Sequence, residues 1–366
     1  MATIALDATY SLDPEPTGIA TYSRRLVESV LELDTTHRFL VCYRLSRWHR
    51  RTAFMRPSAG RRRFGVRLFQ EHLTFWLPWQ AEIFHSLAQR PPAFRFRKEV
   101  VTVFDIFPIT GRDYSTPGFQ RKFGSLLRDA VRRASRVITA SRYTAEELQR
   151  HCGVQSNRIR VIPVGVDLPD LSPSAEDRRI ERERWVGRGN ELVLVVGAIQ
   201  NRKNTLGAAR SAALLPERYR FVLAGGNGHG SEAVHEFVRR NQLSGRIVTT
   251  GYVSPAQLES LYRAASVLLF PSFEEGFGIP VLEAMARSVP VVAARTSSLP
   301  EVGGEAARYV DPHSDAAIAF AVRQVIEDES LRARLTSLGL ERAAQFTWRR
   351  TAEQTLEVYE EVLAVR

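Results

Sequence analysis

The sequence predicts two α/β domains, each with a doubly wound parallel sheet. Short apolar segments rich in β-branched residues alternate with longer segments of helical periodicity, which is the pattern of parallel strands joined by helices. The alternation stops at one polar stretch and then starts again. At 366 residues the chain is also longer than a single hydrophobic core usually supports. These three observations favour two α/β domains in series, each with its own core.

Within the first domain, the predicted strands are apolar segments rich in Val and Ile. They lie at 3–10, 38–45, 81–87, 99–107, 135–141 and 158–166. Apolar residues that return every three to four positions predict long helices at 119–134 and 144–152. The same periodicity at 350–364 predicts a C-terminal helix.

The second domain follows the polar stretch DLPDLSPSAEDRRIERERW, which we interpret as the linker, with the boundary near residues 168–185. Its predicted strands and long helices lie at 191–199, 218–226, 246–253, 266–272, 289–295 and 307–311, and at 204–214 and 315–327. We therefore assign residues 1–168 to the first domain and 169–349 to the second. Two such domains leave a cleft between the carboxyl ends of their strands, where ligands of this architecture bind.

Cysteine content and the N-terminus bear on the cellular compartment. The two cysteines, Cys42 and Cys152, are too few and too far apart for a disulfide scaffold or a thiolate metal site. The N-terminal residues lack the basic and apolar regions of a signal peptide. No apolar run approaches the ~18 residues that span a bilayer. We therefore expect a cytoplasmic protein.

The net charge of +11 is concentrated in the first half of the chain. Residues 1–165 carry 27 Lys and Arg against 14 Asp and Glu, whereas the remainder carries 24 against 26. Much of the excess lies at 44–67, where arginines, among them Arg61, Arg62 and Arg63, alternate with aromatic residues. Three interpretations of this segment remain open, namely nucleic-acid binding, attachment to anionic lipid headgroups, and a solvated basic loop without a partner.

The stretch PSFEEGFGIPVLEAMA, residues 271–286, carries the clearest chemical signal. It predicts a tight loop after an apolar strand, and then a helix with Pro280 in its first turn. On this prediction Glu275 lies in the loop and Glu283 in the first helical turn. Glycines let the backbone approach a ligand, and a helix N-terminus attracts an anion. Carboxylates on both sides of an anion suit hydrogen bonds from sugar hydroxyls, so the implied ligand is a nucleoside diphosphate sugar. Each glutamate alone also has a structural explanation, as a charge near a helix N-terminus or as the cap of a turn.

Two glycines elsewhere also follow predicted strands. Gly197 ends the strand in VVGAIQNRKN, and Arg202 and Lys203 stand just before the next predicted helix. Two cations at the carboxyl end of a strand suit a diphosphate leaving group, whose charge grows in the transition state, although solvated surface charges are the alternative. Gly18 lies between the first strand and the next helix, where it can approach a phosphate or an acceptor.

With these motifs the sequence resembles the retaining family 4 glycosyltransferases, which have the GT-B fold. FEEGFGIPVLEAMA carries Glu275 and Glu283 in the E-x7-E arrangement of that family. Further matches run in family order over nearly the whole chain: ITASRYTAEEL, VIPVGVD, GAIQNRKN, TTGYVSPAQLESLYRAASVLLFPS and SSLPEVGGEAARYVDP. The GT-B fold has two Rossmann-like domains facing across a cleft, so the resemblance agrees with the predicted architecture.

The resemblance implies that the first domain binds the acceptor and the second the donor. Glu283 would hold the ribose hydroxyls of the nucleotide, and Glu275 would contact the transferred sugar. Arg202 and Lys203 would hold the diphosphate, which Gly18 would face from the first domain. The other candidate binding residues are Gly197 and the stretch that would line sugar and phosphate, Gly276, Phe277, Gly278 and Ile279. The C-terminal helix, within 350–366, would pack back on the first domain.

The resemblance also implies the chemistry. The family transfers sugars with retention, usually described as front-face attack in which the leaving phosphate helps to deprotonate the acceptor. It needs no metal or other cofactor, and the sequence shows no evident metal cluster of carboxylates and histidine. The expected partners are therefore a nucleotide-sugar donor and a saccharide or lipid-linked acceptor, without nucleic acid.

The sequence departs from the family pattern at Phe104, where many members carry the histidine of a His-Asp pair, while Asp105 remains as a candidate catalytic residue. That histidine is commonly placed beside the C6 hydroxyl of the donor sugar. A phenyl ring offers no hydrogen bond there, and an unpaired buried hydroxyl costs ~1–3 kcal/mol. Two interpretations of Phe104 remain open. In one, Phe104 simply packs under a loop and an ordinary hexose donor binds; in the other, the donor has an apolar or absent C6 substituent, as in a 6-deoxyhexose or a pentose. Other departures are Ala198 in place of an arginine, and Arg287-Ser288-Val289-Pro290 in place of small-Gly-Thr-Pro.

The leading hypothesis is a retaining, metal-independent glycosyltransferase in surface polysaccharide or glycolipid synthesis. Its donor would be a GDP-mannose-like hexose or a 6-deoxyhexose. The basic segment 44–67 then becomes a candidate contact with the inner face of an anionic membrane. Two alternatives remain, a catalytically silent relative that binds a nucleotide sugar and a nucleic-acid-binding α/β protein. The second alternative leaves the glutamates of the 271–286 stretch unexplained.

Overall fold

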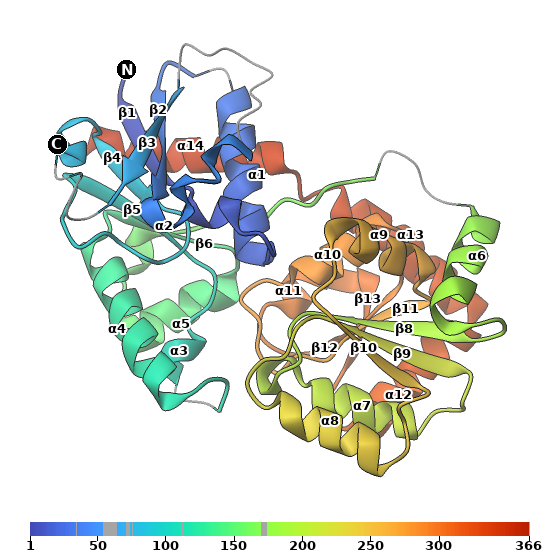
Figure 1. The fold of residues 1–366 in the computed structure, drawn as a ribbon. Coiled ribbons are helices and arrows are strands. Elements are labelled where there is room, and N and C mark those ends of the chain that lie inside the picture. Colours follow the sequence, from blue (N-terminus) through green and yellow to red (C-terminus); the bar gives the residue numbers. More distant parts are fainter. Residues whose placement is uncertain are drawn as a thin grey trace. The chain divides into compact units, whose positions relative to one another are not determined.

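The computed structural model describes residues 1–33, 35–53, 64–70, 74, 76–110, 113–169 and 174–365. The chain divides into two compact α/β units (Figure 1). Unit 1 comprises Met1–Thr110, Pro117–Gly165 and Phe346–Arg366, and unit 2 comprises Gly111–Thr116 and Val166–Gln345. The C-terminal segment thus belongs to unit 1, and the division at Gly165 falls a few residues before the sequence-based boundary at 168. None of the helices in the described ranges is both long and apolar enough to cross a membrane.

Unit 1 is built on a parallel sheet which, in the described residues, has seven strands in the order β3-β2-β1-β4-β5-β6-β7. The strands are β1 (Thr3–Asp7), β2 (Arg38–Arg44), β3 (Phe64–Phe69), β4 (Ile83–Ser86), β5 (Lys98–Val103), β6 (Arg136–Thr139) and β7 (Ile159–Val161). The helices are α1 (Gly18–Glu32), α2 (Leu45–Trp48), α3 (Phe107–Thr110), α4 (Pro117–Arg133), α5 (Arg142–Cys152) and α14 (Trp348–Ala364). This outward order on both sides of β1 and β4 is the predicted doubly wound topology.

Helices cover both faces of this sheet. Val101 of β5 packs in one apolar cluster with residues of α4 and α5, whereas the next residue, Thr102, is hydrogen-bonded to Tyr22 of α1. Neighbouring side chains of a strand point to opposite faces, so α1 lies on the face opposite α4 and α5. His85 Nδ1 of β4 lies 2.6 Å from the hydroxyl of Tyr359 on α14, and its Nε2 lies 2.9 Å from Thr102 Oγ1. The C-terminal helix therefore shares the α1 face.

No strand is predicted at 64–69, where the structure has strand β3, which begins within the basic segment 44–67 and ends just beyond it. Its glycine and arginine and the arginines before it hide the apolar pattern, and most of its residues are only half-buried at the sheet edge. The interpretation of 44–67 as a solvated loop is therefore wrong for α2 and β3. Residues 54–63, with Arg61, Arg62 and Arg63, lie outside the described residues.

Unit 2 also has a parallel sheet, with six strands in its described part in the order β10-β9-β8-β11-β12-β13. The strands are β8 (Glu191–Val196), β9 (Tyr219–Ala224), β10 (Ile247–Gly251), β11 (Val267–Phe270), β12 (Val291–Ala294) and β13 (Ala307–Val310). The helices are α6 (Ala175–Val186), α7 (Thr205–Ala213), α8 (Ser231–Arg240), α9 (Pro255–Ala264), α10 (Ile279–Ala286), α11 (Leu299–Gly303), α12 (Asp315–Glu327) and α13 (Glu329–Ala343). The two units confirm the predicted fold class of two doubly wound α/β domains.

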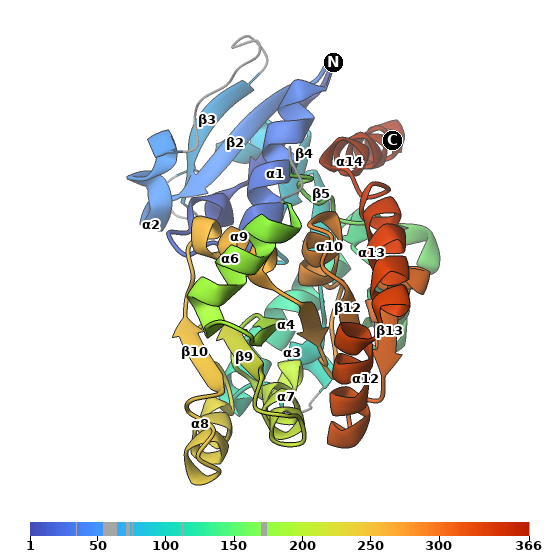
Figure 2. The same ribbon diagram turned by 90° about the vertical axis from the view of Figure 1, so that its right-hand side faces the viewer.

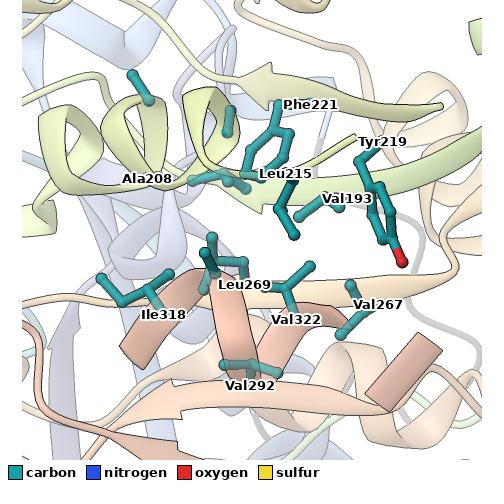
Figure 3. Packing of buried hydrophobic residues seen from close by; sticks show 14 of the residues in the cluster. Val193, Ala208, Leu215, Tyr219, Phe221, Val267, Leu269, Val292, Ile318 and Val322 are labelled. Carbon is teal, nitrogen blue, oxygen red and sulfur yellow. The ribbon is translucent and has the colours of Figure 1, made fainter. Parts of the chain in front are cut away.

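One apolar cluster of unit 2 lies between its sheet and the helices α7, α8 and α12. Figure 3 shows Val193, Phe221 and Leu269, from three neighbouring strands, together with Ala208 of α7 and Val322 of α12. All five are essentially inaccessible to solvent. Burial of such side chains contributes about 1.5–3 kcal/mol each. This core holds the ends of β8 and β11, from which the candidate site is built.

The polar stretch predicted as the linker contains helix α6. A capping box between Ser174 and Asp177 starts this helix, and Trp185 Nε1 donates a hydrogen bond to Ser260 Oγ of α9 at 2.8 Å. Figure 2 shows α6 beside α9. The linker prediction is therefore wrong for α6, because a helix that packs largely through polar contacts lacks the apolar periodicity on which that prediction depends.

Candidate functional site

The candidate site of unit 2 lies at the carboxyl ends of β8, β11 and β12. In a parallel sheet these ends meet at one edge, where ligands of open α/β sheets bind. A 3-10 turn, η5 (Asn201–Lys203), follows β8 and brings Arg202 beside the loop after β11. Phe273 N of that loop donates to the Arg202 carbonyl at 2.9 Å. The predicted residues of the two loops are thus neighbours in space.

Arg202, Lys203 and Glu275 form one charged cluster. Arg202 Nη1 lies 3.0 Å from Glu275 Oε2, and Lys203 Nζ lies 2.6 Å from Glu275 Oε1. The three side chains are only 12%, 15% and 8% exposed, respectively. Arg202 Nη1 also donates to the Glu274 carbonyl at 2.7 Å. The carboxylate therefore bridges two cations, and all three side chains are largely buried.

This environment controls the charge of Glu275. Burial by itself raises the pKa of the carboxyl, but the charges of Lys203 and Arg202 outweigh burial and lower the pKa to about 2. Glu275 is therefore ionised at any physiological pH. An ionised carboxylate is a strong acceptor for hydroxyl donors.

Gly197 gives Lys203 the room to reach Glu275. Its φ is +124°, and a Cβ there would lie 3.1 Å from Lys203 Cε. On its other side Lys203 Nζ lies 4.7 Å from the centre of the Phe270 ring, at the end of β11. An ammonium over an aromatic face is stabilised by the charge distribution of the ring. Gly197 and Phe270 together thus direct the ammonium.

Two serines after β12 hold the loop that carries Glu275. Glu275 N donates to Ser297 Oγ at 2.9 Å. Ser298 Oγ is within hydrogen-bond distance of the carbonyls of Glu275 and Phe277, at 2.8 and 2.9 Å. Neither serine is among the site residues predicted from the sequence. A usable signal exists, because polar residues directly after two neighbouring parallel strands are expected at the same sheet edge.

The loop ends in helix α10. Gly276 and Phe277 are buried, and Gly278 caps the helix with φ +107°. A Cβ at Gly278 would lie 2.8 Å from Leu299 Cδ2, so both backbone conformation and space require glycine. Ile279 and Pro280 are the first helical residues, and no side chain caps them. The first N–H groups of α10 thus border the loop of Glu275.

Glu283 lies in the second turn of α10, so its predicted place in the first turn is wrong. The helix has no acidic residue in its first turn, and Glu283 is therefore too far along to serve mainly as a charge at the helix N-terminus. Its Oε2 instead accepts a hydrogen bond of 2.8 Å from the hydroxyl of Tyr262 on α9. Among the described residues, the side chain contacts Tyr262 rather than the Arg202–Lys203–Glu275 cluster.

The remaining candidates, Gly18, Phe104 and Asp105, lie in unit 1. Gly18 is the exposed first residue of α1, and Phe104 and Asp105 directly follow β5. Phe104 is 9% exposed and packs edge-on against Tyr22, with ring centres 4.8 Å apart. Its carbonyl accepts a hydrogen bond from Thr144 Oγ1 at 3.0 Å. The ring is therefore held firmly beside the end of β5.

Acidic, histidine and cysteine side chains are the usual ligands of protein-bound metal ions. Within the described ranges, no group of three or more such side chains is arranged to hold a metal ion. The charged groups of the candidate site in unit 2 are instead two cations around one carboxylate. This donor set suits an anion better than a divalent cation.

Comparison with known families matches both halves of the chain. Residues 17–169 match the model of "Glycosyltransferase Family 4", and residues 177–342 match that of "Glycosyl transferases group 1". O-antigen chain mannosyltransferase B of Escherichia coli is 31% identical over 269 residues, which cover 72% of this chain and 71% of that protein. A D-inositol 3-phosphate glycosyltransferase of Acidothermus cellulolyticus is 32% identical over 251 residues, which cover 65% of this chain and 56% of that protein.

Solved structures share the fold. Anabaena Alr3699/HepE, in complex with UDP and glucose, superposes with a TM-score of 0.76 at 19% identity over 99% of this chain and 100% of its own. Sucrose-phosphate synthase of Thermosynechococcus elongatus gives 0.78 at 20% identity over the full length of both chains. At these sequence identities the similarity shows the fold alone. That fold is GT-B, which has two Rossmann-like domains. With both halves matched by family models and a relative aligned over most of each chain, the chain belongs to the family 4 glycosyltransferases.

Proposed function

We propose that this chain is a retaining, metal-independent glycosyltransferase of surface polysaccharide or glycolipid synthesis. It moves a sugar from a nucleoside diphosphate donor, with a GDP-mannose-like hexose as the leading candidate, to a saccharide or lipid-linked acceptor. Unit 2 binds the donor and unit 1 the acceptor. The observation that carries the proposal is the pairing of Arg202 and Lys203 with Glu275 at the carboxyl ends of β8 and β11.

The charged cluster matches both ends of such a donor. When the donor binds, its diphosphate pairs with Arg202 and Lys203. The Glu275 carboxylate, which these two cations hold in the absence of donor, is then free to accept hydrogen bonds from hydroxyls of the sugar. The first N–H groups of α10 and the backbone of Gly276, Phe277 and Gly278 border the same place and suit a phosphate. Farther along α10, Glu283 accepts hydrogen bonds from the ribose hydroxyls.

The reaction needs no enzymic nucleophile. The acceptor oxygen forms a bond to C1 of the sugar on the face that the diphosphate leaves. The bond from C1 to the phosphate oxygen breaks, its electron pair leaves with the diphosphate, and the acceptor proton passes to the leaving phosphate oxygen. Arg202 and Lys203 stabilise the negative charge that grows on that oxygen. Asp105 is the candidate in unit 1 for orienting the acceptor.

Two observations bear on the donor sugar. The relatives named mannosyltransferases support a hexose such as mannose. Phe104, packed on Tyr22 and unable to bind a C6 hydroxyl, supports a 6-deoxyhexose as the second candidate. The two donors differ only by that hydroxyl when their stereochemistry is matched, so a direct comparison separates them.

The composition of the basic segment 44–67 favours contact with an anionic membrane, but the ion pairs of two of its arginines weaken that argument. Arg44 is only 12% exposed and pairs with buried Asp7 at 3.1 Å, and Arg47 pairs with Asp13 at 3.2 Å. These arginines serve unit 1 itself. Sedimentation with vesicles of zwitterionic or anionic lipid tests the other arginines of the segment. If binding depends neither on anionic lipid nor on Arg61, Arg62 and Arg63, this contact is excluded.

The test of the whole proposal is a panel of GDP-, UDP-, dTDP- and ADP-sugars, each with its free diphosphate and with chelator present. One donor class is expected to raise the melting temperature, since a ligand that binds only the folded state stabilises it. The shift should disappear in Glu283→Ala. Release of diphosphate in the presence of an oligosaccharide acceptor establishes turnover. Binding without turnover on any acceptor supports a silent relative, and no binding at all contradicts the proposal.

A further inference from the structure

The contacts around Glu283 include a residue that departs from the family pattern, Arg287. It ends α10, and its Nη1 donates to the Glu283 carbonyl at 3.0 Å. Its Nε lies 2.6 Å from Glu259 Oε2 on α9. The guanidinium carbon also lies 5.3 Å from the centre of the Tyr262 ring. Arg287 therefore joins α9 to α10 beside Glu283.

Tyr262 itself is almost completely buried, with 1% of its surface exposed. Its hydroxyl donates to one oxygen of Glu283, Oε2, at 2.8 Å. Glu283 is half-buried as a whole residue, so the protein does not enclose it completely. A carboxylate has two oxygens and accepts several hydrogen bonds, and fixing one oxygen fixes the direction of the other.

The charges near Glu283 oppose one another. Burial raises the pKa of Glu283, the hydrogen bond from Tyr262 and the charge of Arg287 lower it, and the carboxylates of Asp167 and Glu259 raise it. Overall the pKa of Glu283 is raised above its ordinary value. The charge of Arg287 thus opposes protonation of Glu283, and Glu259 holds the guanidinium in place.

We propose that Tyr262 and Arg287 are positioning residues for Glu283, which they hold so that its second oxygen accepts from the ribose hydroxyls of the donor. Tyr262 sets the direction of the carboxylate, and Arg287 anchors both the Tyr262 ring and the end of α10. This inference rests on the proposed function, because it requires a nucleoside diphosphate at the site. It adds two residues, one of them a departure from the family pattern, to the determinants of ribose recognition.

A purely structural brace between α9 and α10 would explain the same contacts. The two explanations differ in what they predict for ligands. A brace supports stability and affects every nucleotide equally. A positioning residue affects only ligands that carry the ribose hydroxyls, so its loss removes the discrimination between a nucleotide and its dideoxy analogue.

The experiment measures the dissociation constants of GDP and UDP and of their 2′,3′-dideoxy analogues by calorimetry on the full chain. Wild type is expected to prefer the ribose form by about tenfold to a hundredfold, the usual effect of hydrogen bonds to a charged group. In Glu283→Gln and in Tyr262→Phe the preference should fall to about threefold or less. The double variant should lose no further discrimination, because both changes remove one interaction.

Tyr219→Phe is the matched control. Tyr219 is a buried tyrosine of β9 in the same unit, and its hydroxyl donates to Glu327 at 2.8 Å. Its replacement removes a comparable hydrogen bond to a glutamate and should leave the ribose preference at the wild-type value. Preserved discrimination in Tyr262→Phe, with discrimination lost in Glu283→Gln, overturns the positioning role and leaves the proposed function intact. A wild-type chain that binds no nucleotide overturns both.

Arg287 offers a second test if Tyr262→Phe fails to fold. In Arg287→Ala the pKa of Glu283 should rise further, so GDP affinity should begin to fall at a higher pH than in wild type when the pH is lowered. Arg287→Lys keeps the charge and should restore most of the wild-type pH profile. An unchanged pH profile in Arg287→Ala would overturn the role of Arg287.

Discussion

Lys203 Nζ lies 2.6 Å from Glu275 Oε1 at the carboxyl ends of strands β8 and β11. Arg202 pairs with the other oxygen of the same carboxylate at 3.0 Å. The cluster joins the two loops that the sequence analysis identified separately, and it places the candidate diphosphate and sugar contacts next to each other.

The pH dependence of stability should report on Glu275. Its pKa is lowered in the folded protein, from an ordinary value of 4.5 to about 2. The stabilisation is therefore complete at neutral pH, begins to disappear below about 4.5 and is lost near 2. At neutral pH it amounts to about 3 kcal/mol. Glu275→Gln should thus lower the denaturation midpoint at pH 7, and the difference from wild type should shrink between pH 5 and pH 3. A constant difference across this range would contradict the assignment, and Glu353→Gln, at an exposed ion pair, serves as the control.

Lys203→Met should weaken binding of the diphosphate selectively. The substitution keeps much of the side-chain volume over Phe270 but removes the charge that faces the phosphates. We expect the dissociation constant of the nucleoside diphosphate to rise at least tenfold, because charge-assisted contacts are worth about 1.5–3 kcal/mol. The nucleoside without phosphates should bind as to wild type. Calorimetry measures both, and equal losses for both ligands would point to damage of the fold.

Gly197→Ala should displace Lys203 without removing its charge. The backbone at φ +124° costs about 1–3 kcal/mol for a residue with a Cβ. The new Cβ would also lie 3.1 Å from Lys203 Cε. We expect a lower melting temperature together with weaker diphosphate binding. Gly226→Ala is the matched control, since a Cβ there meets no atom within 4 Å. Unaltered diphosphate affinity in Gly197→Ala would show that Lys203 tolerates displacement.

Phe104→His should change the choice of donor. The imidazole supplies the hydrogen-bond partner that the phenyl ring lacks, so kcat/KM for a hexose donor relative to its 6-deoxy counterpart should rise about tenfold. Phe104→Leu, which changes the packing against Tyr22 without adding a polar group, should leave this ratio unchanged. The measurement is steady-state turnover with both donors. A ratio that stays constant in Phe104→His would leave packing as the role of this residue.

Metal removal and product stereochemistry test the proposed chemistry. Turnover in the presence of EDTA should equal that with added magnesium or manganese, because Arg202 and Lys203 supply the positive charge for the leaving diphosphate. Nuclear magnetic resonance of the early product should show the anomeric configuration of the donor. Activity that disappears with EDTA and returns with one cation would contradict metal independence. An inverted product would contradict retention.

The general course of the fold follows from local sequence patterns. The alternation of apolar strands and periodic helices predicts both sheets, because a strand buried on both faces must be apolar nearly throughout. Strand β3 and helix α6 escape this signal for a common reason. Helix α6 is largely charged, and the short strand β3 contains a glycine and an arginine and follows a run of arginines. Their formation depends on a neighbouring helix or on a sheet edge rather than on their own apolar pattern.

The sequence by itself determined which residues supply the chemistry of the candidate site, since two cations, two glutamates and the glycines between them are recognisable by type and spacing. Only the tertiary structure decided how they are paired. Glu275 meets Arg202 and Lys203 because β8 and β11 are neighbours in a sheet whose order differs from the chain order. Glu283, eight residues later, contacts Tyr262 of α9 instead, because it lies in the second turn of α10, beyond the loop that carries Glu275. The order of strands in a sheet and the contact of one helix with another depend on long-range packing, which no local pattern of residues predicts.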